Sequence, residues 1–388
     1  MWGKKTTFGR KGNRMATPEQ FPGLVVVKIG SSTLTDELGR VDEGFIANLC
    51  EQVAILRGEG RHVVIVTSGA AAAGRERLGI VGRPRDIPTL QACAAAGQAA
   101  LTEAYAKELA RLDLTCGQVL LTRRDVVDRE GYLNARNTFD RLLELGAVPV
   151  VNENDTVSVS EFAFGDNDML GAIVSALLGA SLYVVLSDVA GLYTSNPSED
   201  DDAELIMEVH TIDDAIASVA GGSASSVGTG GMASKVRAAR AMLAAGIPMI
   251  VCHGRKRGVL VDAVHGMRVG TRFANSSGPV RGNGRKLWIG IAEIPRGSVV
   301  VDDGARDALL VDGASLLPVG IHCVSGDFDA GDVVSIEDME GHEIGRGVSR
   351  FSADDLMRVR GLKLDVVERF FPEKAGQPAV HRDELLVF

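Results

Sequence analysis

The sequence predicts a three-layer α/β sandwich on a mainly parallel open sheet, followed by a small β-barrel-like domain. Its 388 residues favour two or three domains by length alone. Short apolar runs alternate with helical patterns from residue 24 to about residue 272, a rhythm typical of α/β domains. After Phe273 the chain changes to short strands separated by Gly and Asp turns, as in small all-β domains.

Most strand candidates of the first domain are continuously apolar, as expected of parallel strands that are covered on both faces. They lie at residues 24–29, 62–67, 114–121, 148–152, 182–187 and 248–252. The first long helix is expected to carry an apolar face on Ile46, Leu49, Val53 and Leu56 and to end near Gly58. Further helices are predicted at residues 90–112, 136–145 and 169–178.

The second domain follows a small, polar stretch with the composition of a linker. Its strands are expected at residues 287–294, 298–301, 320–325, 332–337 and 343–347, with helical patterns near 303–310 and 354–360. We therefore divide the chain into a disordered or non-native extension (1–20), an α/β domain (21–273), a linker (274–284), a β domain (285–365) and a tail (366–388).

Charge and composition narrow the function classes. The formal charge of −10 disfavours a general nucleic-acid binder, and no apolar run approaches the ~18 residues needed to cross a bilayer. The five scattered cysteines suggest a reduced compartment. The first fourteen residues carry five basic residues and no acid, so Met15 is the expected natural start, and a basic RNA-binding arm is the alternative.

Four polar loops follow predicted strands or open helices of the first domain. They are KIGSS (28–32), TSGA (67–70), the pair NEND (152–155) and GDND (165–168), and GTGGMASK (228–235). Taken singly, such loops are often turns or helix caps. Because parallel strands end at one edge of a sheet, we expect the loops to gather there, with lysines and N–H groups suited to phosphate.

Common nucleotide motifs do not explain these loops. Gly228, Gly230 and Ala233 match the dinucleotide fingerprint, but they follow a polar run rather than a strand. The next strand ends in Cys252-His253, where an acidic residue would be needed for the ribose. The Walker A motif and the protein-kinase signatures are absent from the sequence.

The combination of loops resembles the amino acid kinase superfamily and, within it, the glutamate 5-kinase family. The likeness extends from residue 24 to about residue 382 and includes LLTR (120–123), REGYLNARN (129–137) and AGLYT (190–194). The second domain resembles the PUA domain through SLLP (315–318), Gly326 and Phe328, Gly331-Asp332 and GVSR (347–350).

The resemblance implies that ATP phosphorylates the γ-carboxylate of L-glutamate, the first step towards proline. It implies that Lys28 and Lys235 neutralise the transferring phosphoryl group and that Asp168 positions them. The implied glutamate contacts are Ser68, Asp155 and Asn167. The implied ATP contacts are Lys28, Gly30, Ser187, Asp188, Thr229, Gly230, Gly231, Met232, Ala233, Ser234 and Lys235. Ser187 stands where the family commonly has Thr. Mg²⁺ is expected to be held chiefly by ATP phosphates and water, without dedicated protein ligands.

The family also implies a cytoplasmic homo-oligomer, a dimer or tetramer, that proline inhibits by feedback and that hands its product to glutamate-5-semialdehyde dehydrogenase. Aspartate, N-acetylglutamate, uridylate and carbamate kinases share the scaffold and remain alternatives; NEND, GDND and the PUA-like domain favour glutamate. An RNA-binding PUA protein is the other alternative. Residues 285–361 hold eight basic and fourteen acidic residues, a net charge of 8 − 14 = −6, which favours an architectural or regulatory role.

Overall fold

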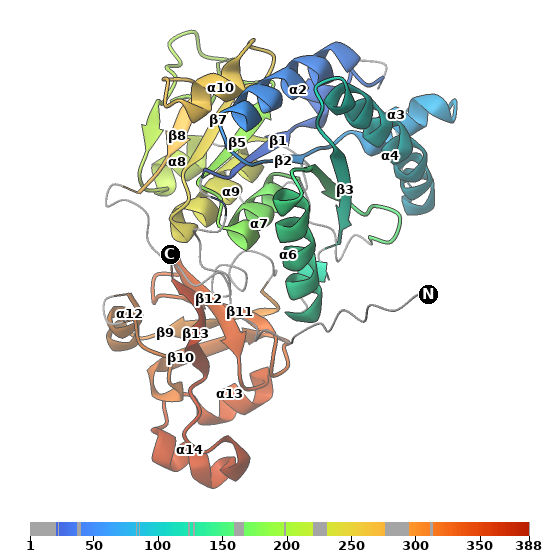
Figure 1. Cartoon of the computed structure of the whole chain (residues 1–388). Coiled ribbons are helices and arrows are strands. Elements are labelled where there is room, and N and C mark those ends of the chain that lie inside the picture. The colour runs from blue at the N-terminus through green and yellow to red at the C-terminus, as the bar shows by residue number, and fades with distance from the viewer. Residues whose placement is uncertain are drawn as a thin grey trace, which may run out of the picture.

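Two sheets organise the chain in the computed structural model (Figure 1). The structure describes residues 21, 23–36, 40–82, 84, 86–122, 125–126, 129–158, 167–197, 199–219, 231–275, 295–310 and 313–387. The larger sheet has the strand order β3-β4-β2-β1-β5-β7-β8-β6, and the smaller has the order β10-β9-β11-β12-β13. The predicted fold class, an α/β sandwich with a mainly parallel sheet followed by a smaller β domain, is confirmed.

The larger sheet is parallel except where β7 pairs with β8. Its strands are β1 (Val25–Ile29), β2 (Val63–Val66), β3 (Cys116–Leu121), β4 (Val148–Glu153), β5 (Leu182–Ser187), β6 (Glu208–Val209), β7 (Met249–His253) and β8 (Thr271–Phe273). Because β1, β2, β4 and β5 run side by side in one direction, the loops after them meet at a single edge.

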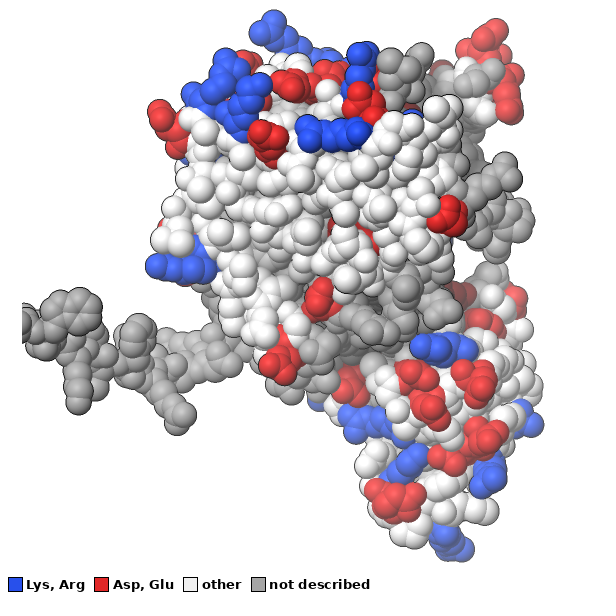
Figure 2. Space-filling view, turned by 90° about the vertical axis from the view of Figure 1, so that its right-hand side faces the viewer, with Lys and Arg blue, Asp and Glu red and all other residues white. Residues whose placement is uncertain are grey.

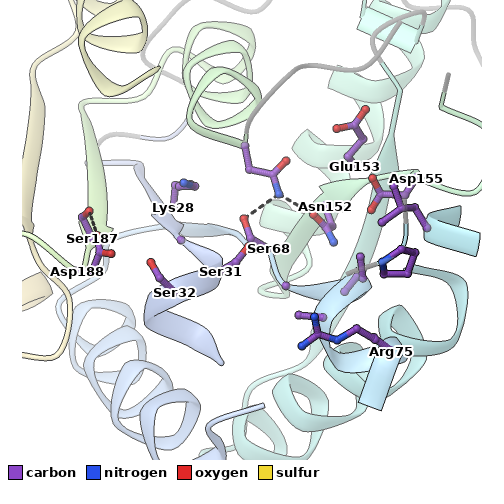
Figure 3. Close-up of a pocket in the computed structure, with 18 of the residues that line it drawn as sticks. Lys28, Ser31, Ser32, Ser68, Arg75, Asn152, Glu153, Asp155, Ser187 and Asp188 are labelled. Atoms are coloured by element: carbon purple, nitrogen blue, oxygen red, sulfur yellow. Dashed lines mark hydrogen bonds between the residues drawn. The ribbon is translucent and has the colours of Figure 1, made fainter. Parts of the chain in front are cut away.

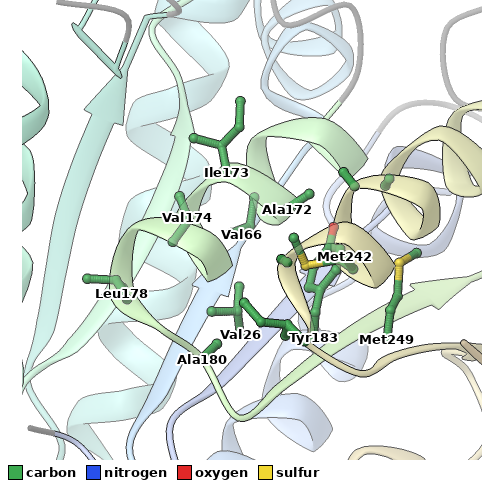
Figure 4. Close-up of a cluster of buried hydrophobic side chains, with 14 of the residues drawn as sticks. Val26, Val66, Ala172, Ile173, Val174, Leu178, Ala180, Tyr183, Met242 and Met249 are labelled. Atoms are coloured by element: carbon green, nitrogen blue, oxygen red, sulfur yellow. The ribbon is translucent and has the colours of Figure 1, made fainter. Parts of the chain in front are cut away.

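Helices cover both faces of this sheet. One face packs against α2 (Glu43–Gly58), α4 (Ile87–Ala110) and α10 (Val259–Val264). The other packs against α6 (Arg129–Glu144), α7 (Asn167–Leu178) and α9 (Met232–Ala245) (Figure 4). The short helices are α1 (Ser31–Leu34), α3 (Ala70–Arg77) and α8 (Asp214–Val219). No helix within the described ranges is long and apolar enough to span a membrane.

Alternation along β1 decides which layer each side chain enters. Val25 and Val27 belong to the core beneath α2 and α4, whereas Val26 belongs to the core beneath α7 and α9. Successive strand residues point to opposite faces. Lys28 is therefore directed to the same side as Val26, where α7 and α9 lie.

Helix α3 lies unusually close to α4 because glycines face one another at their contact. A Cβ on Gly74 would overlap the carbonyl oxygen of Cys93, and a Cβ on Gly97 would overlap that of Ala70. Gly69, the N-cap of α3, has a φ of +86°, which favours glycine. The start of α3 is thus fixed against the longer helix.

The second sheet consists of β9 (Gly297–Val301), β10 (Ile321–Gly326), β11 (Val333–Glu337), β12 (Glu343–Ser349) and β13 (Val380–Val387). Its pairs are antiparallel except β9 with β11. The associated helices are α12 (Asp303–Leu310), η1 (Pro318–Gly320), α13 (Ala353–Val359), α14 (Leu364–Phe370) and η2 (Pro372–Lys374).

Several elements differ from the sequence prediction. Strands β6 and β8 were not predicted because two or three residues are too short to show periodicity. Residues 366–388 were set apart as a tail, yet β13 pairs with β12 through a segment rich in charged residues. Helix α6 begins seven residues before its predicted start. The extension 1–20, most of the linker and the predicted strand 287–294 lie outside the described residues.

Candidate active site

A cavity of about 540 Å³ opens at the carboxyl ends of β1, β2, β4 and β5 (Figure 3). Ligands of open α/β sheets bind at this edge. Side chains from all four predicted loops line the cavity. Its polar lining consists of Lys28, Ser31, Ser32, Ser68, Arg75, Asn152, Glu153, Asp155, Asn167, Ser187, Asp188 and Lys235.

Lys28 and Lys235 converge on the buried carboxylate of Asp168. Lys28 Nζ forms an ion pair with Asp168 Oδ1, and Lys235 Nζ lies 3.3 Å from Oδ2. The exposed fraction of the side chain is only 5% for Lys28, 6% for Lys235 and 0% for Asp168. Burial would raise the pKa of Asp168, but the two lysines outweigh it, so the pKa lies below its usual value. Asp168 therefore remains ionised and holds both ammonium groups at one end of the cavity.

Two further contacts hold Asp168 in place. Ser234 Oγ donates a hydrogen bond to Asp168 Oδ2 at 2.7 Å, and the buried Tyr183 hydroxyl donates to the Asp168 carbonyl oxygen at 2.8 Å. Gly171 makes room for that tyrosine, because a Cβ there would overlap its hydroxyl. Tyr183 was not predicted as a site residue, because in the sequence it is one more residue of an apolar strand.

The backbone N–H of Gly30, beside Lys28, does not face the cavity as expected. The Gly30 N–H, expected to face the nucleotide, donates to the carbonyl oxygen of Leu186 at 3.2 Å. The N–H groups of Ser31 and Ser32 follow it in the first turn of α1, where N–H groups have no acceptor within the helix. Gly231 forms the N-cap of α9 with φ −74°, so its own conformation does not require glycine.

Ser187 and Asp188 lie on the Lys28 side of the cavity (Figure 3). The buried Ser187 hydroxyl donates to Asp188 Oδ1 at 3.0 Å. Burial would raise the pKa of Asp188, but hydrogen bonds from Ser187 and Ser32 and the charge of Lys235 lower it overall. The carboxylate is thus ionised beside the phosphoryl end.

Ser68, Asn152 and Asn167 form a polar network in the middle of the cavity. Asn167 Nδ2 lies 2.9 Å from Ser68 Oγ, 2.8 Å from Asn152 Oδ1 and 2.6 Å from the Thr67 carbonyl oxygen. Asn152 Nδ2 in turn donates to Gln98 Oε1 at 2.7 Å. The network joins the loop after β2 to β4 and α7 and fixes the predicted contacts Ser68 and Asn167 relative to each other.

Asp155 and Glu153 lie at the opposite side of the cavity from Lys28 (Figure 3). Burial, and after it the charge of Glu153, raises the pKa of Asp155 to about 6. Ser158 Oγ donates to Glu153 Oε1 at 2.7 Å. A pair of carboxylates at this position suits a positively charged group such as an ammonium.

The structure describes most, not all, of the predicted site. Thr229 and Gly230 lie outside the described residues, as does the first half of GDND. Gly231, Met232, Ala233 and Ser234 are described but do not belong to the described lining of the cavity. Arg75 lines it and was missed. Its helical spacing from Ala71 and Ala72 could have indicated a shared face, but no motif includes it.

Comparisons with known proteins show the family of the chain. The amino acid kinase family model matches residues 23–253, and the PUA domain model matches residues 297–371. The chain is 46% identical to the glutamate 5-kinase of Geobacter sp. (strain M21) over 94% of its own length and 97% of that protein. The glutamate 5-kinases of Pelobacter propionicus and Serratia proteamaculans are both 44% identical over 94% of this chain, covering 97% and 98% of those proteins.

Among solved structures, the UMP kinase of Bacillus anthracis superposes with a TM-score of 0.46 at 15% identity, covering 66% of this chain and 96% of that one. This likeness is distant. The sequence relatives, by contrast, match both domains over nearly the whole length. The chain therefore belongs to the amino acid kinase family and, within it, to the glutamate 5-kinases with a C-terminal PUA domain.

Proposed function

We propose that the chain transfers the γ-phosphoryl group of ATP to the γ-carboxylate of L-glutamate, giving L-glutamyl 5-phosphate, the first step of proline biosynthesis. The observation that carries this proposal is the convergence of Lys28 and Lys235 on Asp168, in a cavity whose far side holds Asp155. The relatives named glutamate 5-kinase support the choice of acceptor.

The charges of the cavity fit direct in-line transfer. A carboxylate acceptor has a reference pKa of roughly 4.3, so it is ionised at pH 7 and needs no general base. The difficulty is to bring this anion against the ATP phosphates, which requires fixed positive charge in a water-poor site. Lys28 and Lys235 supply that charge, and Asp168 acts as the positioning residue that keeps them together.

On the nucleotide side, we assign ATP contacts to Lys28, Gly30, Ser187, Asp188 and the segment Thr229–Lys235. Mg²⁺, where it accompanies ATP, neutralises phosphate charge. The two lysines engage Asp168, which leaves its carboxylate poorly suited to bind a metal ion. ATP phosphates and water are therefore the proposed ligands of Mg²⁺. On the acceptor side, Ser68, Asp155 and Asn167 contact glutamate.

The test of the proposed function is glutamate-dependent ADP release, with hydroxylamine present to trap the acyl phosphate as a hydroxamate. Aspartate, N-acetylglutamate, UMP and carbamate serve as alternative acceptors. We expect hydroxamate only with glutamate. Equal or greater activity with another acceptor would assign the chain to that reaction instead.

Replacing Asp155 by alanine should raise the KM for glutamate about 10- to 100-fold while kcat changes less than about threefold, because a charged hydrogen bond to the substrate ammonium is lost.

In the unmodified chain, a pKa of about 6 means that Asp155 is mostly protonated at pH 5. The glutamate KM should therefore rise about tenfold from pH 7 to pH 5. Steady-state kinetics at both pH values measure this, and an unchanged KM in the variant would remove Asp155 from the acceptor contacts.

Gly30→Ala should raise the KM for ATP about tenfold and leave the glutamate KM unchanged, because backbone at this turn is expected to approach phosphate closely. The protein itself has room for the methyl group: its nearest neighbours would lie 3.9 Å away. Unfolding free energy should stay within about 0.5 kcal/mol of the unmodified chain. Gly58→Ala, in α2 with no atom within 4 Å of the added Cβ, is the matched control. An unaltered ATP KM in Gly30→Ala would contradict this placement.

We further propose that the large domain forms a homo-oligomer, a dimer or a tetramer. Figure 2 looks onto the side where α4, α6 and β3 lie in Figure 1, and a wide area there carries few charged side chains. Strand β3 is the edge of the sheet on this side, and most of its residues are only half-buried. An unpaired edge beside a weakly charged face suits association with a second copy.

The remaining proposals concern regulation and location. We propose that proline inhibits the enzyme by competing near the glutamate contacts, that the product passes to glutamate-5-semialdehyde dehydrogenase, and that the protein is cytoplasmic. For the PUA domain we propose an architectural or regulatory role rather than RNA binding. Lys/Arg and Asp/Glu are interspersed on its visible face in Figure 2, without a basic patch.

A further inference from the structure

One wall of the cavity carries a cation for which the reaction as described has no use. Helix α3 contributes Ala70, Ala71, Ala72 and Arg75 to the lining. Ala71 and Arg75, four residues apart, lie on the same side of the helix. The alanines are small, so Arg75 is the polar side chain that α3 gives to this wall.

Close contact with α4 holds α3 in place. Gly74 and Ala70 contact α4 so closely that no Cβ fits on Gly74 or Gly97. Arg75 therefore projects from a helix whose distance to α4 is set by backbone contact. Its placement is a property of the packing rather than of a flexible loop.

Charge pairing distinguishes Arg75 from the other cations of the cavity. Among the described lining residues the cations are Lys28, Arg75 and Lys235. Asp168 holds both lysines, whereas no ion pair joins Arg75 to any described residue. In Figure 3 Arg75 lies on the side of Asp155, away from Ser187 and Asp188. A half-buried guanidinium in this position is available for an anion on the acceptor side.

We infer that Arg75 binds the α-carboxylate of the amino-acid acceptor, an inference that rests on the proposed function. An α-amino dicarboxylic acid carries three charges. Its γ-carboxylate would approach Lys28 and Lys235, and its ammonium would approach Asp155. Its α-carboxylate needs a cation near those acids, and Arg75 is placed to supply it. A guanidinium can bind a carboxylate through two parallel hydrogen bonds, which makes recognition strict.

The test compares glutamate with its α-amide, isoglutamine, in the full-length enzyme and in Arg75→Gln. In the unmodified enzyme, kcat/KM should fall about 10- to 100-fold when the α-carboxylate becomes an amide, because a charged hydrogen bond is lost. In Arg75→Gln, kcat/KM for glutamate should fall by a similar factor. The two acceptors should then differ less than about threefold. The ATP KM should stay within about threefold, and Arg77→Gln, an exposed neighbour on α3, should behave as the unmodified enzyme.

Other results overturn the inference. The inference is wrong if Arg75→Gln still discriminates between glutamate and isoglutamine, or if the unmodified enzyme does not discriminate between them. It is also wrong if Arg75→Gln raises the KM for ATP, which would make Arg75 a phosphate contact. Should Arg75→Gln fail to fold, Arg75→Lys takes its place in the test. This variant keeps the positive charge, so it should retain part of the discrimination between glutamate and isoglutamine. Absence of glutamate-dependent hydroxamate with the unmodified enzyme would instead refute the proposed function, so the two failures are distinguishable.

Discussion

Lys28→Ala and Lys235→Ala should each lower kcat by about 10²- to 10³-fold, or roughly 2.7–4 kcal/mol of transition-state stabilisation. Each lysine lies within a buried ion pair at the phosphoryl end of the cavity, where charge is worth far more than in water. Asp168 keeps one lysine partner in either variant, so both chains should fold. Single-turnover ADP formation with saturating glutamate measures the loss directly.

A suitable control for these variants is Lys107→Ala. Lys107 pairs with Glu43 at 3.0 Å on the surface, and both side chains are well exposed. Such pairs contribute about 0–1 kcal/mol to stability, and this one lies away from the cavity lining. Its kcat should equal that of the unmodified chain. A near-normal kcat in Lys28→Ala or Lys235→Ala would show that phosphoryl transfer does not depend on the paired ammonium groups.

Asp168→Ala should have the largest combined effect, because it leaves two buried ammonium groups without their shared anion. Removing one partner of a buried ion pair typically costs about 3–5 kcal/mol of folding free energy. We expect a lower urea midpoint for the full chain, together with a loss of kcat at least as large as in the single lysine variants. Asp168→Asn keeps the shape and the Ser234 contact, so it should be less unstable and still inactive. Activity retained in both variants would show that Asp168 does not position the lysines.

The pH dependence of stability gives an independent check. The pKa of Asp168 is lowered in the folded chain, so its contribution is present above the unfolded pKa of about 3.8 and is lost as pH falls through the folded value. The difference in unfolding free energy between the unmodified chain and Asp168→Asn should therefore shrink below about pH 4. A constant difference across that range would contradict the ion-pair assignment.

The sequence carries enough information to predict the phosphoryl end of the site. Lys28 lies near the end of a strand of otherwise apolar residues, and parallel strands bring the loops that follow them to one edge of the sheet. That logic brings Lys28, Ser68 and Asp155 to one cavity without any coordinates. The residues on α7 and α9 follow from the same topology, since both helices cover the face towards which Lys28 points.

Other parts of the site depend on contacts that leave no local pattern. Tyr183 supports Asp168 only because Gly171 allows its hydroxyl to reach the helix backbone. The Gly30 N–H is taken by Leu186, a neighbour on the adjacent strand rather than in sequence. Strand β13 was missed for a similar reason. Hydrogen bonds to β12 determine it, and its own polar composition resembles a loop.

The glycine contact between α3 and α4 has a mechanical consequence. Two helices that touch backbone to backbone have no side-chain layer to compress, so α3 cannot advance on a bound amino acid or retreat from it independently of α4. The acceptor wall should keep its position through the reaction cycle. Any narrowing of the cavity around its substrates should then come from parts of the lining other than α3.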